Sequence, residues 1–262
     1  ALLGPSKAVG ESLEAKLASF GANILISPRT ETLSVGYGGL ALGDVSVDIK
    51  YLPQDAVTDA IRSIHHKDRI SAVAPKFALL IKIDALPVGV LGVDFPEELL
   101  IKGYWHTTSG ELPQAANQIL AGAAAANKLK LAPGSTVTVL GTAMTVSGVL
   151  GPTGGQDDGL LFTDLAGLQR AAGAENQIHF VEVAALCSGC PIDEITAQIA
   201  AKLFDQGADV VISGPDTPEA LDAAMQRRKT GARAFAVAYD SKDGCDAGPE
   251  ACLGSLFFNW GP

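Results

Sequence analysis

Basic residues, aromatic residues and long apolar runs are all scarce in this sequence, and each scarcity excludes a class of protein. The chain has 19 Lys and Arg against 29 Asp and Glu, a formal net charge of −10. A nucleic-acid-binding protein needs a basic surface that displaces counterions from phosphate, and electrostatic docking on anionic lipid needs a similar surface. Both classes are therefore excluded. Aromatic residues make up only 6% of the chain, so small aliphatic residues must fill the core.

No apolar run reaches the roughly 18 residues that a membrane-spanning helix needs. The N-terminal sequence ALLGPSKAVGESLEAKL lacks both the basic flank and the long apolar core of a signal peptide. It begins in the middle of a helical pattern. We therefore expect the sequence to be a piece of a longer protein.

The 262 residues, 47% of them hydrophobic, are enough for one large domain or two modest ones. Strand and helix patterns alternate in the order β-α-β-β, then a region of different texture, then β-α-β. Three segments carry more specific expectations. The Gly-rich residues 29–43 predict a loop, the strand over residues 70–85 is placed near a sheet edge because it contains Pro75, and the Ala-rich residues 114–131 predict a helix.

Cysteine offers the clearest candidate chemistry, because the four residues form two local pairs, Cys187/Cys190 and Cys245/Cys252. The Cys187-Ser-Gly-Cys190 segment lies between a strand pattern and a helix start, where a thiolate is stabilised. Three interpretations stay open: a disulfide that closes a turn, a soft-metal site, and a thiol-redox site. We expect disulfides on both pairs, with Cys187 and Cys190 as the only metal-ligand candidates.

No catalytic or cofactor-binding residue can be nominated. The four histidines have no partner at a recognisable ligand or triad spacing. The segment GYGGLALG does not open a helix in a βαβ setting, and GPTGGQDDG lacks the end of a phosphate loop. Asp157 and Asp158 fit a plain turn better than a cation site.

The middle of the chain resembles the periplasmic core domain of MacB-like and FtsX-like ABC transporter permeases. The resemblance covers roughly residues 7–229, and it rests on the order and spacing of several loose motifs. These motifs are Gly103-Tyr-Trp105; Gly122, Ala126, Leu129, Leu131 and Gly134; Val146-Ser-Gly-Val-Leu150; and Leu165, Leu168 and Gln169. The Cys-x-x-Cys pair is not a general feature of that family.

The resemblance implies an α+β fold with two subdomains. Residues 1–95 and 175–230 would form a discontinuous, porter-like split β-α-β subdomain, and residues 96–174 a smaller inserted α/β subdomain. Residues 231–262 would be a tail of uncertain origin.

The resemblance also implies a non-catalytic, cofactor-free domain at the periplasmic or extracytoplasmic face of the cell membrane. It would transmit ATP-driven motion and contact substrate or a periplasmic partner. The implied partners are a cytoplasmic ATPase subunit, reached through membrane helices outside this sequence, and a periplasmic adaptor or a second permease copy. The alternatives are a secreted metal-binding or thiol-redox protein centred on Cys187 and Cys190, and a ligand-capturing domain.

Overall fold

A computed structural model describes residues 22, 24–28, 31–37, 40–48, 51–185, 192–205, 210–212, 219–232, 234–239, 245–246 and 248–256. The chain divides into two compact units. The first contains Asp68–Cys190 together with the N-terminal Ala1–Ala22, and the second contains Asn23–Lys67 and Pro191–Pro262. The 3₁₀ turn η1 (Lys67–Arg69) lies where the chain passes from the second unit to the first.

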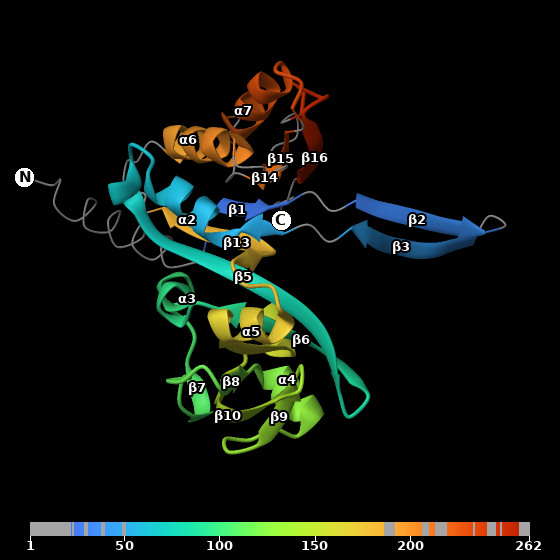
Figure 1. Cartoon of the computed structure of the whole chain (residues 1–262), viewed down its shortest axis with the longest axis vertical. Coiled ribbons are helices and arrows are strands. Elements are labelled where there is room, and N and C mark those ends of the chain that lie inside the picture. Colours follow the sequence, from blue (N-terminus) through green and yellow to red (C-terminus); the bar gives the residue numbers. More distant parts are fainter. Residues whose placement is uncertain are drawn as a thin grey trace, which may run out of the picture. The chain divides into compact units, whose positions relative to one another are not determined.

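The first unit is built on a mixed sheet in the order β13-β5-β6-β11-β8-β10-β7, with β9 paired to β10. The pairs β6–β11 and β8–β10 are parallel, and the other neighbouring pairs are antiparallel. The strands are β5 (Ile70–Ile83), β6 (Leu86–Val93), β7 (Thr107–Gly110), β8 (Gln118–Ala121), β9 (Thr136–Val139), β10 (Thr142–Leu150), β11 (Leu160–Asp164), β12 (Gln177–Ile178) and β13 (Phe180–Ala185). Figure 1 shows β5 as one long strand that runs into the β5–β6 hairpin.

Short helices connect these strands. They are α3 (Phe95–Ile101), α4 (Ala123–Leu129), the 3₁₀ turn η2 (Gln156–Gly159) and α5 (Leu165–Ala172). Aspartate side chains cap the start of two of them, α3 and α5. Asp94 accepts a hydrogen bond from the Glu97 amide at the start of α3, and Asp164 accepts one from Gly167 at the start of α5. Helix α5 ends at Gly173, whose φ of 64° is easily adopted only without a side chain.

Pro75 does not place β5 at a sheet edge, so that expectation was wrong. β13 pairs with β5 over Ile70–Lys76 on one side, and β6 begins to pair at Lys76 on the other. The Val73 amide points away from β13 and donates to Glu97 Oε2 at 2.8 Å. Because alternate residues of a strand point their amides the same way, Pro75 stands where an N–H would lack a strand partner.

The second unit has a four-stranded sheet in the order β16-β15-β14-β1. The three C-terminal strands are parallel to one another, and β1 is antiparallel to β14. The strands of this sheet are β1 (Ile24–Ser27), β14 (Val210–Ile212), β15 (Phe235–Tyr239) and β16 (Cys252–Leu256). The short strand β4 (Leu52–Pro53) lies outside it, and the helices are α2 (Gln54–Arg62), α6 (Ile192–Asp205) and α7 (Glu219–Arg228). The predicted tail, residues 231–262, thus contributes β15 and β16 to this sheet.

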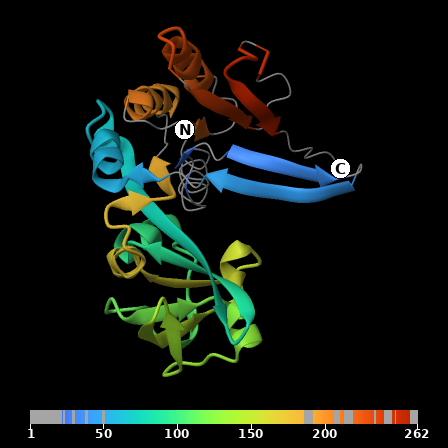
Figure 2. The same ribbon diagram turned by 45° about the vertical axis from the view of Figure 1, so that its right-hand side comes forward.

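Two local expectations are corrected. Residues 29–43 were expected to form a loop, but β2 (Glu31–Tyr37) and β3 (Leu40–Asp48) form an antiparallel ribbon, which Figure 2 shows in blue. The Gly38-Gly39 pair between two strand patterns is a sequence signal for a β-hairpin, and the expected loop did not take it into account. In the Ala-rich stretch 114–131, the helix begins only after Gly122, because Gln118–Ala121 are taken into the sheet as β8. The predicted α+β class is confirmed, whereas the subdomain boundaries at residues 95/96 and 174/175 stay a prediction.

Candidate functional site: a buried ion-pair network

A cluster of buried charges lies within the first unit. Its members are Lys76, Glu98, Lys102, Asp157 and Glu182, which we call the Lys76 network. They come from β5, α3, the C-terminal end of α3, η2 and β13, respectively. Two ammonium groups thus face three carboxylates, and the surrounding structure largely excludes water from them.

Lys76 is the centre of the network on the sheet. Its side chain is only 1% exposed, although it stands in the apolar sequence AVAPKFALL. The Nζ atom lies 2.5 Å from Glu98 Oε2 and 2.9 Å from Glu182 Oε2, and it donates to the Ala74 carbonyl oxygen at 3.3 Å. A buried ammonium group is tolerated only when it is paired and hydrogen-bonded in this way.

Glu98 lies opposite Lys76 on α3 and is fully buried. Burial raises the pKa of Glu98, while the Lys76 and Lys102 ammonium groups oppose that rise. Glu98 Oε1 is 3.4 Å from Lys102 Nζ, one helical turn further along the chain. Within the part of the chain that the structure describes, these two lysines supply the polar contacts of the Glu98 carboxylate.

Asp157 forms the second centre of the network and gathers three donors from one short segment. Lys102 Nζ donates to Asp157 Oδ1 at 2.7 Å, while Trp105 Nε1 and Tyr104 Oη donate to Oδ2 at 2.9 Å and 3.2 Å. Burial is the largest single effect on Lys102 and lowers its pKa. The carboxylates of Glu98 and Asp157 together outweigh burial, so the pKa of Lys102 lies above its ordinary value. Burial also raises the pKa of Tyr104.

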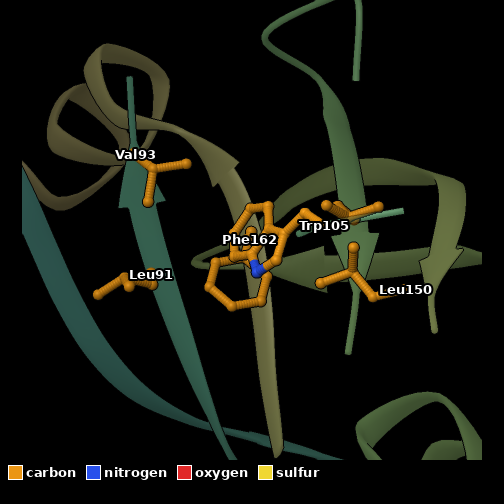
Figure 3. Close-up of a cluster of buried hydrophobic side chains, with 6 residues drawn as sticks. Leu91, Val93, Trp105, Leu150 and Phe162 are labelled. Atoms are coloured by element: carbon orange, nitrogen blue, oxygen red, sulfur yellow. The ribbon is translucent and has the colours of Figure 1, made fainter. Parts of the chain in front are cut away.

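The network continues into an apolar cluster through Trp105. The Trp105 ring lies 4.6 Å from the Phe162 ring, centroid to centroid, and the planes are tilted by 60°. Figure 3 shows the two rings between β6 and β10, with Leu91, Val93 and Leu150 around them. Lys102 Nζ lies 5.1 Å from the Trp105 centroid, within the range of a cation–π contact. Charged and apolar packing therefore meet at a single side chain.

A close backbone approach holds η2 in position. A Cβ atom on Gly122 would lie 2.1 Å from the Asp157 carbonyl oxygen and 2.7 Å from that of Asp158. Only glycine allows the start of α4 to pack this closely on η2. Asp158, the other half of the Asp-Asp pair, accepts hydrogen bonds from the Thr153 amide and hydroxyl and from the Gly154 amide, which lower its pKa.

The role of the network that the geometry supports is structural: it joins elements of the first unit to one another. Each of its carboxylates lies within ion-pair distance of a lysine, and Asp157 also accepts hydrogen bonds from two aromatic side chains. Among the described residues, no group of three or more His, Cys, Asp or Glu side chains is arranged to hold a metal ion. The arrangement fixes α3 and η2 to β5 and β13 by contacts that are strong only in one geometry.

Comparison with known proteins decides the family. The model of the MacB-like periplasmic core domain matches residues 6–227. The chain belongs to this family. A MacB-like periplasmic core domain is the extracytoplasmic part of an ABC-type transporter, which gives this chain its location and its class.

Solved structures share the fold of this MacB-like domain. The extracellular domain of the noncanonic ABC-type transporter YknZ from Gram-positive bacteria matches with a TM-score of 0.50 and 15% identity, over 70% of this chain and 92% of that one. The periplasmic region of MacB from Actinobacillus actinomycetemcomitans matches with a TM-score of 0.51 and 12% identity, over 72% and 86% of the two chains. No curated protein matches the sequence. None of the described helices is long and apolar enough to cross a membrane.

The cysteine expectations have different outcomes. Cys245 and Cys252 form a disulfide across seven positions of the second unit. Cys187 and Cys190 lie outside the described residues, so their pairing, and the metal and redox alternatives, stay predictions.

The Lys76 network itself was not found from the sequence. Its signal was present in Lys76, a single charge inside a long apolar strand pattern. Such a charge either ends the strand or needs a buried partner, but nothing local to Lys76 indicates which carboxylates would serve. His179 was dismissed as a ligand, and its Nδ1 accepts a hydrogen bond from the Ala78 amide at 3.0 Å. Burial lowers the pKa of His179, consistent with a neutral ring.

Proposed function

We propose that this MacB-like domain is a non-catalytic module that transmits ATP-driven movement of the transporter to an extracytoplasmic substrate or partner. The ATP would be hydrolysed by a cytoplasmic subunit or domain. Movement would reach this chain through membrane helices outside the sequence, in a complex with a periplasmic adaptor or a second permease copy.

The observation that supports this role is the Lys76 network. If the first unit moves relative to the second, the first unit itself has to be stiff, because a soft unit would absorb the displacement that it passes on. Glu98 of α3 is fully buried and paired with Lys76 of β5, which is 1% exposed, and Lys102 extends the connection to Asp157 in η2. These contacts fix the elements of the first unit to one another at buried points where water does not screen the charges.

The test follows a distance between the two units in the complete transporter. Spin-labelled non-natural amino acids replace Thr138, exposed in the first unit, and Lys67, exposed in the second, so that native cysteines are untouched. We expect the distance distribution measured by pulsed electron paramagnetic resonance to shift when a non-hydrolysable ATP analogue binds. No shift in the unmutated transporter would refute the transmission role.

A variant pair then tests the network. Lys76→Met/Glu98→Leu removes both buried charges together, which is expected to preserve folding. We expect the ATP-dependent shift to become smaller in this variant. Arg69→Gln, which removes the exposed ion pair with Asp68, serves as the control and should keep the shift. A folded double variant with an unchanged shift would show that the network does not carry movement.

A further inference from the structure

An apolar groove in the first unit has no role in the network or in the proposed transmission. It has a volume of about 410 Å³ and lies between α5 and the β9–β10 hairpin. Its lining includes Val139, Thr142, Met144, Leu168, Arg170 and Ala171. Small-molecule sites occupy roughly 300–1,000 Å³, so the groove has the size of a ligand site.

The groove combines an apolar wall with a single cationic side chain, and this combination limits the chemical class of ligand that fits. Val139, Met144 and Leu168 give it an apolar wall of buried side chains. The one charged residue is Arg170, which is exposed on α5. Across the described residues, no carboxylate forms an ion pair with Arg170, although the chain carries a net charge of −10. A guanidinium group beside an apolar surface is complementary to an anionic head on an apolar chain.

A second, independent observation lies in the hairpin turn next to the groove. Leu140 and Gly141, between the lining residues Val139 and Thr142, both have positive φ, 48° and 83°. Turns of this shape favour Asn-Gly or Asp-Gly, and a leucine there is strained. The Leu140 side chain is also 48% exposed to solvent. The strained turn thus presents an apolar side chain to solvent beside the groove, where a ligand could cover it.

We propose that this groove binds a single-chain anionic amphiphile, such as a free fatty acid. The apolar chain lies against Val139, Met144 and Leu168, Leu140 covers it at the rim, and the anionic head pairs with Arg170. The ligand is a free molecule and not a lipid in a bilayer, because a chain with a net charge of −10 is repelled by an anionic membrane surface. This inference goes beyond the transmission role and does not depend on it.

Isothermal titration of the 262-residue chain with dodecanoate, below its micellar concentration, tests the proposal. We expect saturable binding of one dodecanoate per chain. Dodecanol should bind at least about tenfold more weakly, since it cannot pair with Arg170, and dodecyltrimethylammonium should show no saturable binding. Dodecanoate that fails to saturate, or that binds no better than dodecanol, overturns the proposal.

Variants separate the two parts of the site. Arg170→Gln should weaken dodecanoate binding at least about tenfold and leave dodecanol binding unchanged. Ala171→Trp fills the groove from an exposed position and should abolish binding of both, with an unchanged melting temperature. Arg69→Gln, an exposed arginine elsewhere in the same unit, is the matched control and should bind like the parent chain. Full dodecanoate binding by a folded Ala171→Trp variant would overturn the site.

Leu140→Asn distinguishes a ligand contact from a structural role. Asparagine suits the positive φ of this turn, so the melting temperature should stay the same or rise, while dodecanoate affinity falls. Unchanged affinity would remove Leu140 from the site. A last arm uses vesicles of phosphatidylglycerol, to which we expect no binding; binding to vesicles without binding to free dodecanoate would overturn the choice of a free amphiphile.

Discussion

Replacing Lys76 by methionine is the sharpest test of the buried network. The variant leaves Glu98, which is fully buried, and Glu182, which is 25% exposed, without their shared ammonium partner. Lys102 still lies 3.4 Å from Glu98, but it also has to neutralise Asp157. Breaking a buried ion pair by removing one partner costs about 3–5 kcal/mol, and we expect a loss of that size at neutral pH.

The destabilisation caused by Lys76→Met should depend on pH, and the pKa of Glu98 determines in which direction. Burial already places the pKa of Glu98 above its ordinary value of 4.5, and removal of Lys76 raises it further. An acid whose pKa is raised in the folded state binds more protons there than in the unfolded state. Its favourable contribution is full below the unfolded pKa and is lost as pH rises through the folded pKa. Lys76→Met should therefore cost least near pH 4.5 and most above neutrality.

Urea unfolding at several pH values measures this effect. The chain has two tryptophans, so a Trp260→Phe background leaves Trp105 as the reporter of the first unit. The double variant Lys76→Met/Glu98→Leu is the matched comparison. It removes both buried charges and should stay within about 1 kcal/mol of the parent, because a buried pair and an apolar pair are often nearly equivalent. A loss for Lys76→Met below about 1 kcal/mol, or one independent of pH, would refute the reasoning.

Three further predictions concern other parts of the chain. Gly122→Ala should cost about 1–3 kcal/mol in urea unfolding because its Cβ would meet the backbone of η2, whereas Gly159→Ala, with open space around its Cβ, should cost far less. Burial lowers the pKa of His179 below 6.5, so the contribution of His179 to stability is full above pH 6.5 and is lost as pH falls through the folded pKa. In the non-titrating variant His179→Asn, the free energy of unfolding should depend less on pH below 6.5, and an unchanged pH dependence would contradict this. In a Cys187→Ala/Cys190→Ala background, Cys245→Ala/Cys252→Ala opens a loop between positions seven apart, so we expect a loss of about 2–3 kcal/mol, which reduction of that background should reproduce; equal melting temperatures for its oxidised and reduced forms would argue against this.

The α+β class and the family were accessible from the sequence, because both depend on local patterns. Alternation in a strand such as β13 and the glycines and Leu-Gln spacing of the middle region are properties of neighbouring residues. The β9–β10 hairpin carries a signal of the same kind, two β-branched runs around Gly141.

The expectations that failed required knowledge of neighbours. Pro75 indicated an edge strand, but β5 lies between β13 and β6. Pro75 precedes the residue at which β6 begins to pair, and there Glu97 of α3, not another strand, meets the open side of β5. The Ala-rich stretch has high helix propensity throughout, yet β10 and β11 take Gln118–Ala121 into the sheet. In both places a tertiary partner outweighed the local preference.

The candidate site was decided almost entirely by tertiary structure. Lys76, Glu98 and Glu182 are separated widely along the chain, and nothing local to each predicts that β5, α3 and β13 bring them within ion-pair distance. The sequence by itself determined that Lys76 is a charge in an apolar strand, which requires a partner once water is excluded. Only the fold decided which carboxylates would be that partner, because the choice depends on strand register and on the face that α3 turns to the sheet.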